Sequence, residues 1–124
     1  MKLSPKKKVN IDIKDVAGYE KVKLVRISGN LDALNSESTT QVLDFLIEKN
    51  PGVSLIFDLR EVGFIDSYGN LALIRAHIKA KKARGQVKIF GVNKNIKDIF
   101  ELVGVTKLIP VYKFYEDALA GFKE

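Results

Sequence analysis

The alternation of polar and apolar residues near the N-terminus predicts two β-strands joined by a turn. Residues 9–16 alternate in this way, and residues 22–28, which read VKLVRIS, alternate again. Gly18-Tyr19 lies between the two stretches and is typical of a turn. The pattern therefore predicts a β-hairpin.

A short apolar stretch predicts a buried strand in the middle of the chain. Residues 53–59 read VSLIFDL, which is dense in residues that favour strands, and they follow the turn signal Pro51-Gly52. We expect this strand to lie at the centre of the sheet.

Helical spacing predicts the segments on either side of this strand. A first helix is expected to begin at Asn35 or Ser36 and to run to about Lys49. Its apolar residues are Val42, Leu43, Phe45, Leu46 and Ile47.

A second helix is predicted after the central strand, with Asp66 or Ser67 as its N-cap and with Gly85 as its stop. Its apolar residues are spaced three and four apart: Leu71, Ile74 and Ile78.

Strand and helix alternate through the rest of the chain. The remaining elements are expected at 87–92 (strand), 96–103 (helix), 108–112 (strand) and 114–122 (helix). A hairpin followed by this alternation predicts the α/β class, with a mixed, mostly parallel β-sheet and helices packed on it.

Length and composition agree with one small domain. The chain has 124 residues, of which 46% are hydrophobic and 29% are charged. It has no cysteine, which excludes disulfides and thiolate metal sites. No apolar run is long enough to span a membrane and no signal-peptide pattern follows the first lysines, so a cytoplasmic location is expected.

The net charge of +6 is concentrated at the N-terminus. Four of the 21 basic residues stand in residues 1–8, so the remaining 17 face 15 acidic residues. We expect residues 1–8 to be a flexible basic arm and residues 9–124 to form the domain.

A second basic stretch, residues 67–97, contains eight cations and no acid: Arg75, Lys79, Lys81, Lys82, Arg84, Lys88, Lys94 and Lys97. A solvated helix face is the simplest interpretation. An acidic protein partner is the next alternative. Direct binding to nucleic acid is not expected, because the chain has no basic motif interleaved with aromatic residues.

Ser67 is the main candidate for chemistry, because it lies where the buried strand turns into a helix. It can be a helix cap, a nucleophile or a phosphorylation site. A nucleophile needs a base, and the one histidine, His77, lies ten residues further along the same helix, roughly 15 Å away. No phosphate-binding loop and no ligand cluster for a metal is present, so neither an enzyme nor a cofactor is expected.

Two carboxylates belong to the same candidate site. Asp32 and Asp66, like Ser67, follow strands, and the carboxyl ends of strands are where open α/β sheets place their sites. Asp32 can equally be a turn residue, and Asp66 a helix cap or part of an Asx-turn.

Three segments resemble the STAS domain family. Residues 57–69 read FDLREVGFIDSYG and resemble the family's serine motif, and residues 27–32 read ISGNLD and resemble its second motif. Residues 100–109, FELVGVTKLI, resemble the family's third helix and last strand. The resemblance covers roughly residues 9–122. The chain departs from the family pattern at Tyr68, where a small residue is usual, and at Asn70, where an apolar residue is usual.

The resemblance implies an anti-sigma factor antagonist with a STAS-type fold. Its partners would be an anti-sigma factor that is also a serine kinase, using ATP and Mg²⁺ to phosphorylate Ser67, and a phosphatase. Asp32 and Asp66 would flank the phosphorylated serine, and Tyr68 and Gly69 would belong to the partner-binding surface. Neither nucleic acid nor membrane is implied as a partner, and the chain is expected to be a monomer or a weak dimer. The alternative is a STAS scaffold in a signalling or transport assembly, with Ser67 only a cap.

Overall fold

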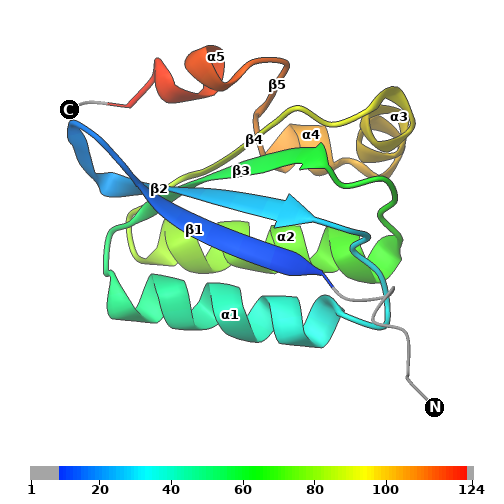
Figure 1. Ribbon diagram of the computed structural model, residues 1–124, viewed down its shortest axis with the longest axis horizontal. Coiled ribbons are helices and arrows are strands. Elements are labelled where there is room, and N and C mark those ends of the chain that lie inside the picture. The colour runs from blue at the N-terminus through cyan, green and yellow to red at the C-terminus, as the bar shows by residue number, and fades with distance from the viewer. Residues whose placement is uncertain (1–8, 123–124) are drawn as a thin grey trace.

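A five-stranded sheet with the order β1-β2-β3-β4-β5 organises the computed structural model, which describes residues 9–122 (Figure 1). The strands are β1 (Asn10–Val16), β2 (Tyr19–Ser28), β3 (Ser54–Glu61), β4 (Val87–Phe90) and β5 (Val111–Tyr112). The helices are α1 (Ser36–Lys49), α2 (Ser67–Lys82), α3 (Lys94–Val103), α4 (Val105–Leu108) and α5 (Tyr115–Leu119). Only β1 and β2 are antiparallel, and the other neighbours are parallel. The predicted mixed, mostly parallel α/β sheet is therefore confirmed.

The predicted hairpin is present. β1 pairs with β2 from Asn10 opposite Ser28 to Asp15 opposite Lys23. β2 begins at Tyr19, three residues before the predicted start. Gly18 lies in the turn with φ of 83°, a conformation that glycine adopts without strain.

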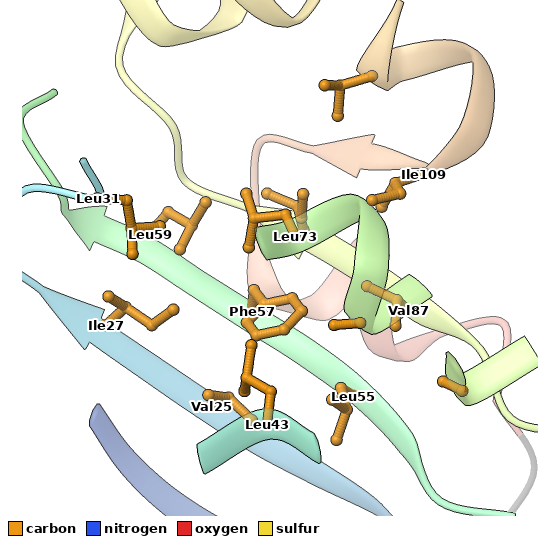
Figure 2. Packing of buried hydrophobic residues seen from close by; sticks show 14 of the residues in the cluster. Val25, Ile27, Leu31, Leu43, Leu55, Phe57, Leu59, Leu73, Val87 and Ile109 are labelled. Atoms are coloured by element: carbon orange, nitrogen blue, oxygen red, sulfur yellow. The ribbon is translucent and has the colours of Figure 1, made fainter. Parts of the chain in front are cut away.

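β3 is the centre of the core, as the sequence predicts. Residues 54–59 are all buried, and the two faces of the strand contact different layers. Leu55, Phe57 and Leu59 pack with residues of α1 and α2, as Figure 2 shows around Phe57. Ile56 lies on the other face, in a smaller cluster with Phe90 and with Ala118 of α5.

The faces that α1 and α2 bury differ from the prediction. Leu71 and Ile78, expected in the core, are 48% and 47% exposed, and Val42 and Phe45 of α1 are also exposed. The buried residues of α2 are instead Gly69, Asn70, Ala72, Leu73, Ala76 and Ala80. Small side chains let a helix approach its neighbours closely, and this face, which contains one glycine and three alanines, packs against α1 and the sheet, as Figure 1 shows.

The C-terminal region also differs from the prediction. The helix that follows β4 starts at Lys94, earlier than expected, and ends at Val103 as predicted, with Gly104 as a left-handed C-cap at φ of 90°. The start of the predicted strand 108–112 is helical, because the Ile109 N–H donates to the Val105 carbonyl at 2.9 Å. Only Val111–Tyr112 pairs as a strand, and the last helix is limited to Tyr115–Leu119.

One lysine of the basic stretch is not solvated. Lys88 on β4 is 5% exposed, and its Nζ donates to the Ala118 carbonyl at 3.0 Å. The ammonium also lies over the Phe122 ring, 4.2 Å from its centroid. Burial lowers the pKa of this lysine. The expectation of a fully solvated basic stretch was therefore wrong at Lys88, because α5 covers this face of β4.

The predicted flexible arm, residues 1–8, lies outside the described residues. Within residues 9–122, no helix is both long and apolar enough to cross a bilayer.

Candidate functional site

The carboxyl ends of β2 and β3 form the candidate site, which we call the Ser67 rim and define as residues 29–35 and 62–69. Backbone hydrogen bonds continue past both strands and hold the two loops together. The Leu31 N–H donates to the Phe64 carbonyl at 3.0 Å, and the Asp66 N–H donates to the Leu31 carbonyl at 3.1 Å. Leu31 and Ile65 form an isolated parallel bridge and are both fully buried. The pairing of β2 with β3 therefore continues into the two loops and sets how they lie beside each other.

Asp66 is the residue that organises the rim. As the N-cap of α2, its Oδ1 accepts from the N–H groups of Tyr68 and Gly69, at 2.9 and 3.0 Å. Its Oδ2 accepts from the N–H of Ala33 at 3.0 Å, in the loop that follows β2. One carboxylate thus caps the helix and ties it to the neighbouring loop. The cap interpretation of Asp66 is confirmed, and the bond to Ala33 is an addition that the sequence does not signal.

Ser67 is the first residue of α2 and is exposed. Because Asp66 is the cap, the interpretation of Ser67 as the cap is wrong. Within the described part of the chain, the Ser67 hydroxyl makes no hydrogen bond. It stands at the positive end of the α2 dipole, where negative charge is stabilised.

Asp32 lies on the same edge, in the loop after β2. Its Oδ1 accepts from the Leu34 N–H at 3.0 Å, which is an Asx-turn. Its own N–H donates to Oδ1 of Asn35 at 3.1 Å, and Nδ2 of Asn35 donates to the Asn30 carbonyl at 2.6 Å. Asp32 therefore shapes the loop, and as a half-buried residue it also adds negative charge to the rim.

Gly69 is required by close packing. A Cβ atom on Gly69 would lie 2.3 Å from the Leu31 carbonyl oxygen, so only glycine lets α2 start this close to the loop. Since Gly69 is buried, the structure gives it a packing role, and its predicted contact with a partner stays a prediction.

Three exposed apolar side chains lie on the Ser67 rim. Leu34 is 70% exposed, Phe64 50% and Tyr68 57%, and all three belong to the rim. Leu34 and Phe64 were missed in the sequence because they stand in loops, outside any periodic pattern. Exposed apolar residues that gather at one site are typical of a protein-binding surface.

A groove between α1 and α2 begins beside the rim. It has a volume of about 440 Å³ and is lined by Ser36, Glu37, Thr40, Gln41, Tyr68, Leu71, Ala72 and Arg75. Tyr68 thus belongs to both the rim and this groove. The bulky side chain that departs from the family pattern is placed where it can contact a bound protein.

The geometry does not favour a serine nucleophile. α2 is continuous from Ser67 to Lys82, so His77 lies roughly 15 Å along it from the serine. His77 is half-buried, and burial together with the nearby Lys81 lowers its pKa. It is a neutral helix residue rather than a base for Ser67.

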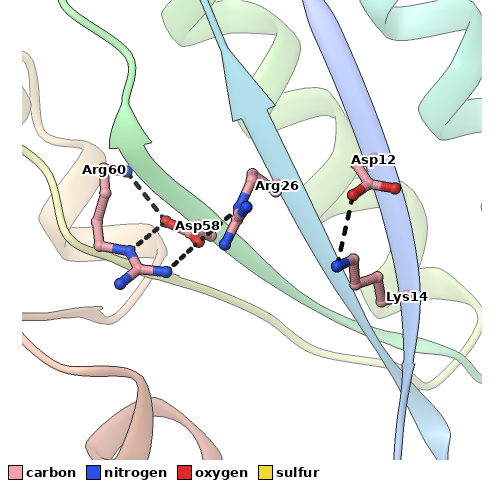
Figure 3. Close-up of polar contacts among 5 residues, drawn as sticks. All are labelled: Asp12, Lys14, Arg26, Asp58 and Arg60. Carbon is pink, nitrogen blue, oxygen red and sulfur yellow. Dashed lines mark hydrogen bonds and ion pairs between the residues drawn. The ribbon is translucent and has the colours of Figure 1, made fainter.

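A charged cluster joins β2 and β3 (Figure 3). The Asp58 side chain is 1% exposed, and its Oδ2 accepts from Arg26 Nε at 3.3 Å and from Arg60 Nη2 at 2.8 Å. Burial raises the pKa of the Asp58 carboxyl, but the hydrogen bonds from Arg60 and Arg26 outweigh this and hold it below its ordinary value. The cluster ties β2 to β3, because one buried carboxylate accepts from an arginine of each strand.

Comparison with known proteins decides the family. The family model described as "STAS domain" matches residues 14–118, which is most of the chain. The chain belongs to the STAS domain family. The predicted membership of this family is thereby confirmed.

Relatives of the STAS domain agree in length and fold. An anti-sigma F factor antagonist of Paenibacillus polymyxa is 23% identical over 111 residues, which cover 90% of this chain and 94% of the relative. The crystal structure of an anti-sigma factor antagonist from Mycobacterium paratuberculosis superposes with a TM-score of 0.80 at 25% identity, over 94% and 95% of the two chains. The Bacillus cell-fate determinant SpoIIAA, solved in a phosphorylated form, has the same fold, with a TM-score of 0.67 at 16% identity over 90% and 97% of the chains.

Proposed function

We propose that this STAS domain is an anti-sigma factor antagonist and that phosphorylation of Ser67 switches it off. It acts as a binding protein rather than as an enzyme. The observation that carries the proposal is the Ser67 hydroxyl itself, which is exposed and makes no hydrogen bond within residues 9–122. The relatives named as anti-sigma factor antagonists support the choice of partner.

The rim suits a serine that is a substrate for a kinase. The transferred γ-phosphoryl group forms a bond to Ser67 Oγ as its bond to ADP breaks, and the hydroxyl proton passes to a base of the kinase. An acceptor hydroxyl must be reachable and in a fixed position. Ser67 meets both conditions, since the cap and the bond from Ala33 hold the start of α2 in place.

The phosphate changes the charge of a crowded site. It adds about −1.5 to −2 charges at neutral pH. The dipole of α2 favours this charge, but the amides of Tyr68 and Gly69 are already bonded to Asp66. The new charge therefore stays at the surface beside the carboxylate of Asp66, and Asp32 adds a further negative charge to the same rim.

Such a charge would release a partner that covers the rim. A protein that buries Leu34, Phe64 and Tyr68 also removes Ser67 from water. A phosphate there must be desolvated and meets the partner's surface without a matching cation, which can cost several kcal/mol. Each 1.4 kcal/mol is a factor of about ten in affinity. A phosphatase would restore the binding surface, and the serine kinase would be the anti-sigma factor itself, as the family resemblance implies.

Substitutions at Ser67 test the proposal. The partner is first captured from the native cell extract with the wild-type chain and identified by mass spectrometry. Ser67→Asp should then weaken calorimetric binding by about tenfold or more, whereas Ser67→Ala should bind like wild type and accept no phosphate. Gln86→Asp is the matched control, because it adds the same charge at an exposed position before β4, at the other end of the sheet.

Two results would reject the switch. One is equal binding by wild type, Ser67→Ala and Ser67→Asp together with no phosphate on the wild-type chain. That result would favour the alternative, a STAS scaffold without phosphoregulation. The other is a loss of binding in Gln86→Asp as large as in Ser67→Asp, which would show that added charge anywhere is sufficient.

A further inference from the structure

The outer edge of the sheet at β1 is a second surface, separate from the Ser67 rim. β1 is the first strand in the order, and within residues 9–122 no segment pairs with its outer side. Alternate backbone N–H and C=O groups of an edge strand point outward and are ready to pair with another strand. The side chains of β1 determine which strand can pair with this edge.

Charges alternate along a row that crosses the sheet and ends at this edge. Asp12 of β1 is opposite Arg26 of β2, and Arg26 is opposite Asp58 of β3. The row therefore reads negative, positive, negative, and its outermost member is the exposed Asp12. The next strand outward would continue the alternation with a cation opposite Asp12.

β1 itself carries that cation. Lys14 lies two residues from Asp12 on the same face of the strand, and its Nζ is 3.8 Å from Asp12 Oδ2 (Figure 3). Both side chains are more than half exposed, so this contact within the strand is weak and easily exchanged.

We propose that β1 pairs antiparallel with β1 of a second copy of this chain, about a two-fold axis at Ile13. This register places Asp12 opposite Lys14 of the second copy, Lys14 opposite Asp12, and Ile13 opposite Ile13. The pairing is self-complementary, as a two-fold interface requires. Opposite charges directly across an antiparallel pair stabilise it. The two sheets become one continuous sheet.

The other face of β1 supports the same axis. Ile13, 38% exposed, lines an apolar groove of about 470 Å³ with residues of α1 that include Val42, Phe45 and Leu46. Phe45 is 63% exposed although it is a large aromatic residue. An axis through Ile13 brings a second, identical groove beside the first, so that the two copies cover each other's exposed apolar side chains. A second copy of the chain would thus pair Asp12 and Lys14 with opposite charges and also cover the apolar groove.

Charge exchange tests the register. Wild type should show a concentration-dependent shift from monomer to dimer in sedimentation. Asp12→Lys places two lysines together at both contacts, and Lys14→Asp places two carboxylates together at both, so each variant alone should stay monomeric. An equal mixture of the two variants restores opposite charges at both contacts. It should form a heterodimer with an affinity within about tenfold of the wild-type homodimer.

Matched variants separate this register from a general effect of charge. The double variant Asp12→Lys/Lys14→Asp keeps the net charge and should dimerise like wild type. It also tests the register if one of the single variants folds poorly. Glu101→Lys, an exposed charge reversal on α3, should leave dimerisation unchanged. Phe45→Ser should weaken the dimer without removing its concentration dependence.

Several outcomes would overturn the proposal. These are a wild-type chain that stays monomeric at its highest soluble concentration, single variants that dimerise like wild type, or a mixture that does not associate. If only a chain lacking residues 1–8 dimerises, the edge is occupied by the chain's own N-terminal residues, and the proposal fails for the full chain.

Discussion

The central strand β3 and the Ser67 rim adjoin in the chain, but they use their side chains in opposite ways. Phe57 of β3 is fully buried among residues of the main core. Ser67 is exposed, and the rim around it is held by backbone hydrogen bonds and by the side chains of Asp32, Asn35 and Asp66. Substitutions in β3 should therefore change stability, whereas a substitution of Ser67 should change function alone. Substitutions of Asp66 and Gly69 should affect both stability and function, because these residues position the serine through packing and hydrogen bonds.

The largest effect is expected at Phe57. Phe57→Ala removes a fully buried ring between the sheet and its helices and leaves a cavity. The free energy of unfolding should fall by about 2–5 kcal/mol. Urea denaturation followed by circular dichroism measures this change. A stability close to wild type would contradict the central position of β3.

Asp58 tests the other face of the same strand. Asp58→Asn leaves Arg26 and Arg60 without their charged partner and should cost about 1–3 kcal/mol at neutral pH. Because the carboxyl pKa is lower in the folded chain than its ordinary value of 3.8, its contribution is complete above that value and is lost as the pH falls through the folded pKa.

The pH dependence provides the control for Asp58. Wild type should lose stability below about pH 4 more steeply than Asp58→Asn, and the two curves should converge in strong acid. A difference in stability that stays constant down to about pH 2 would contradict the ion pairs seen in Figure 3.

Gly69 tests how closely α2 must approach the loop after β2. Alanine favours helices more than glycine does, so Gly69→Ala would stabilise an ordinary helix by about 1 kcal/mol. Here the added Cβ would lie 2.3 Å from the Leu31 carbonyl oxygen and must displace backbone. We expect a net loss of about 1–3 kcal/mol in thermal or urea unfolding. Gly63→Ala, at an exposed glycine where an added Cβ would meet no atom closer than 3.7 Å, is the control and should cost less.

Asp66 should show the smallest of these stability effects, together with a functional one. Asp66→Ala removes the acceptor for Tyr68, Gly69 and Ala33 and should cost about 0.5–2 kcal/mol, as the loss of an N-cap does. Asp66→Asn keeps one oxygen as a cap and should cost less. If Ser67 needs this framework, phosphorylation should be slower in Asp66→Ala than in Asp66→Asn at a temperature where both are folded. Equal rates would show that Asp66 serves stability alone.

Much of this fold could be predicted because local patterns determine it. The hairpin, the apolar run of β3 and the alternation that follows depend on short stretches of sequence. Asp66 before a helical stretch is a local N-cap signal, and it proved correct. The position of Ser67 on the rim followed from these elements.

What could not be predicted depends on contacts between distant segments. The choice of an alanine-rich face over Leu71 and Ile78 is made by the packing of α2 against α1, and spacing alone favours the larger residues. Lys88 is buried only because α5 returns over β4. The hydrogen bond from Ala33 to Asp66 joins two loops that are far apart in the sequence. Neither an alanine nor an aspartate at these positions predicts such a bond.

The measurement that tests the central claim most directly is the mapping of phosphate on the chain after incubation with its captured kinase and ATP. The account predicts one phosphoryl group per chain, on Ser67, none on Ser67→Ala, and release of the partner as phosphate accumulates. Phosphate on another residue, or a fully phosphorylated chain that still binds the partner with wild-type affinity, would contradict it.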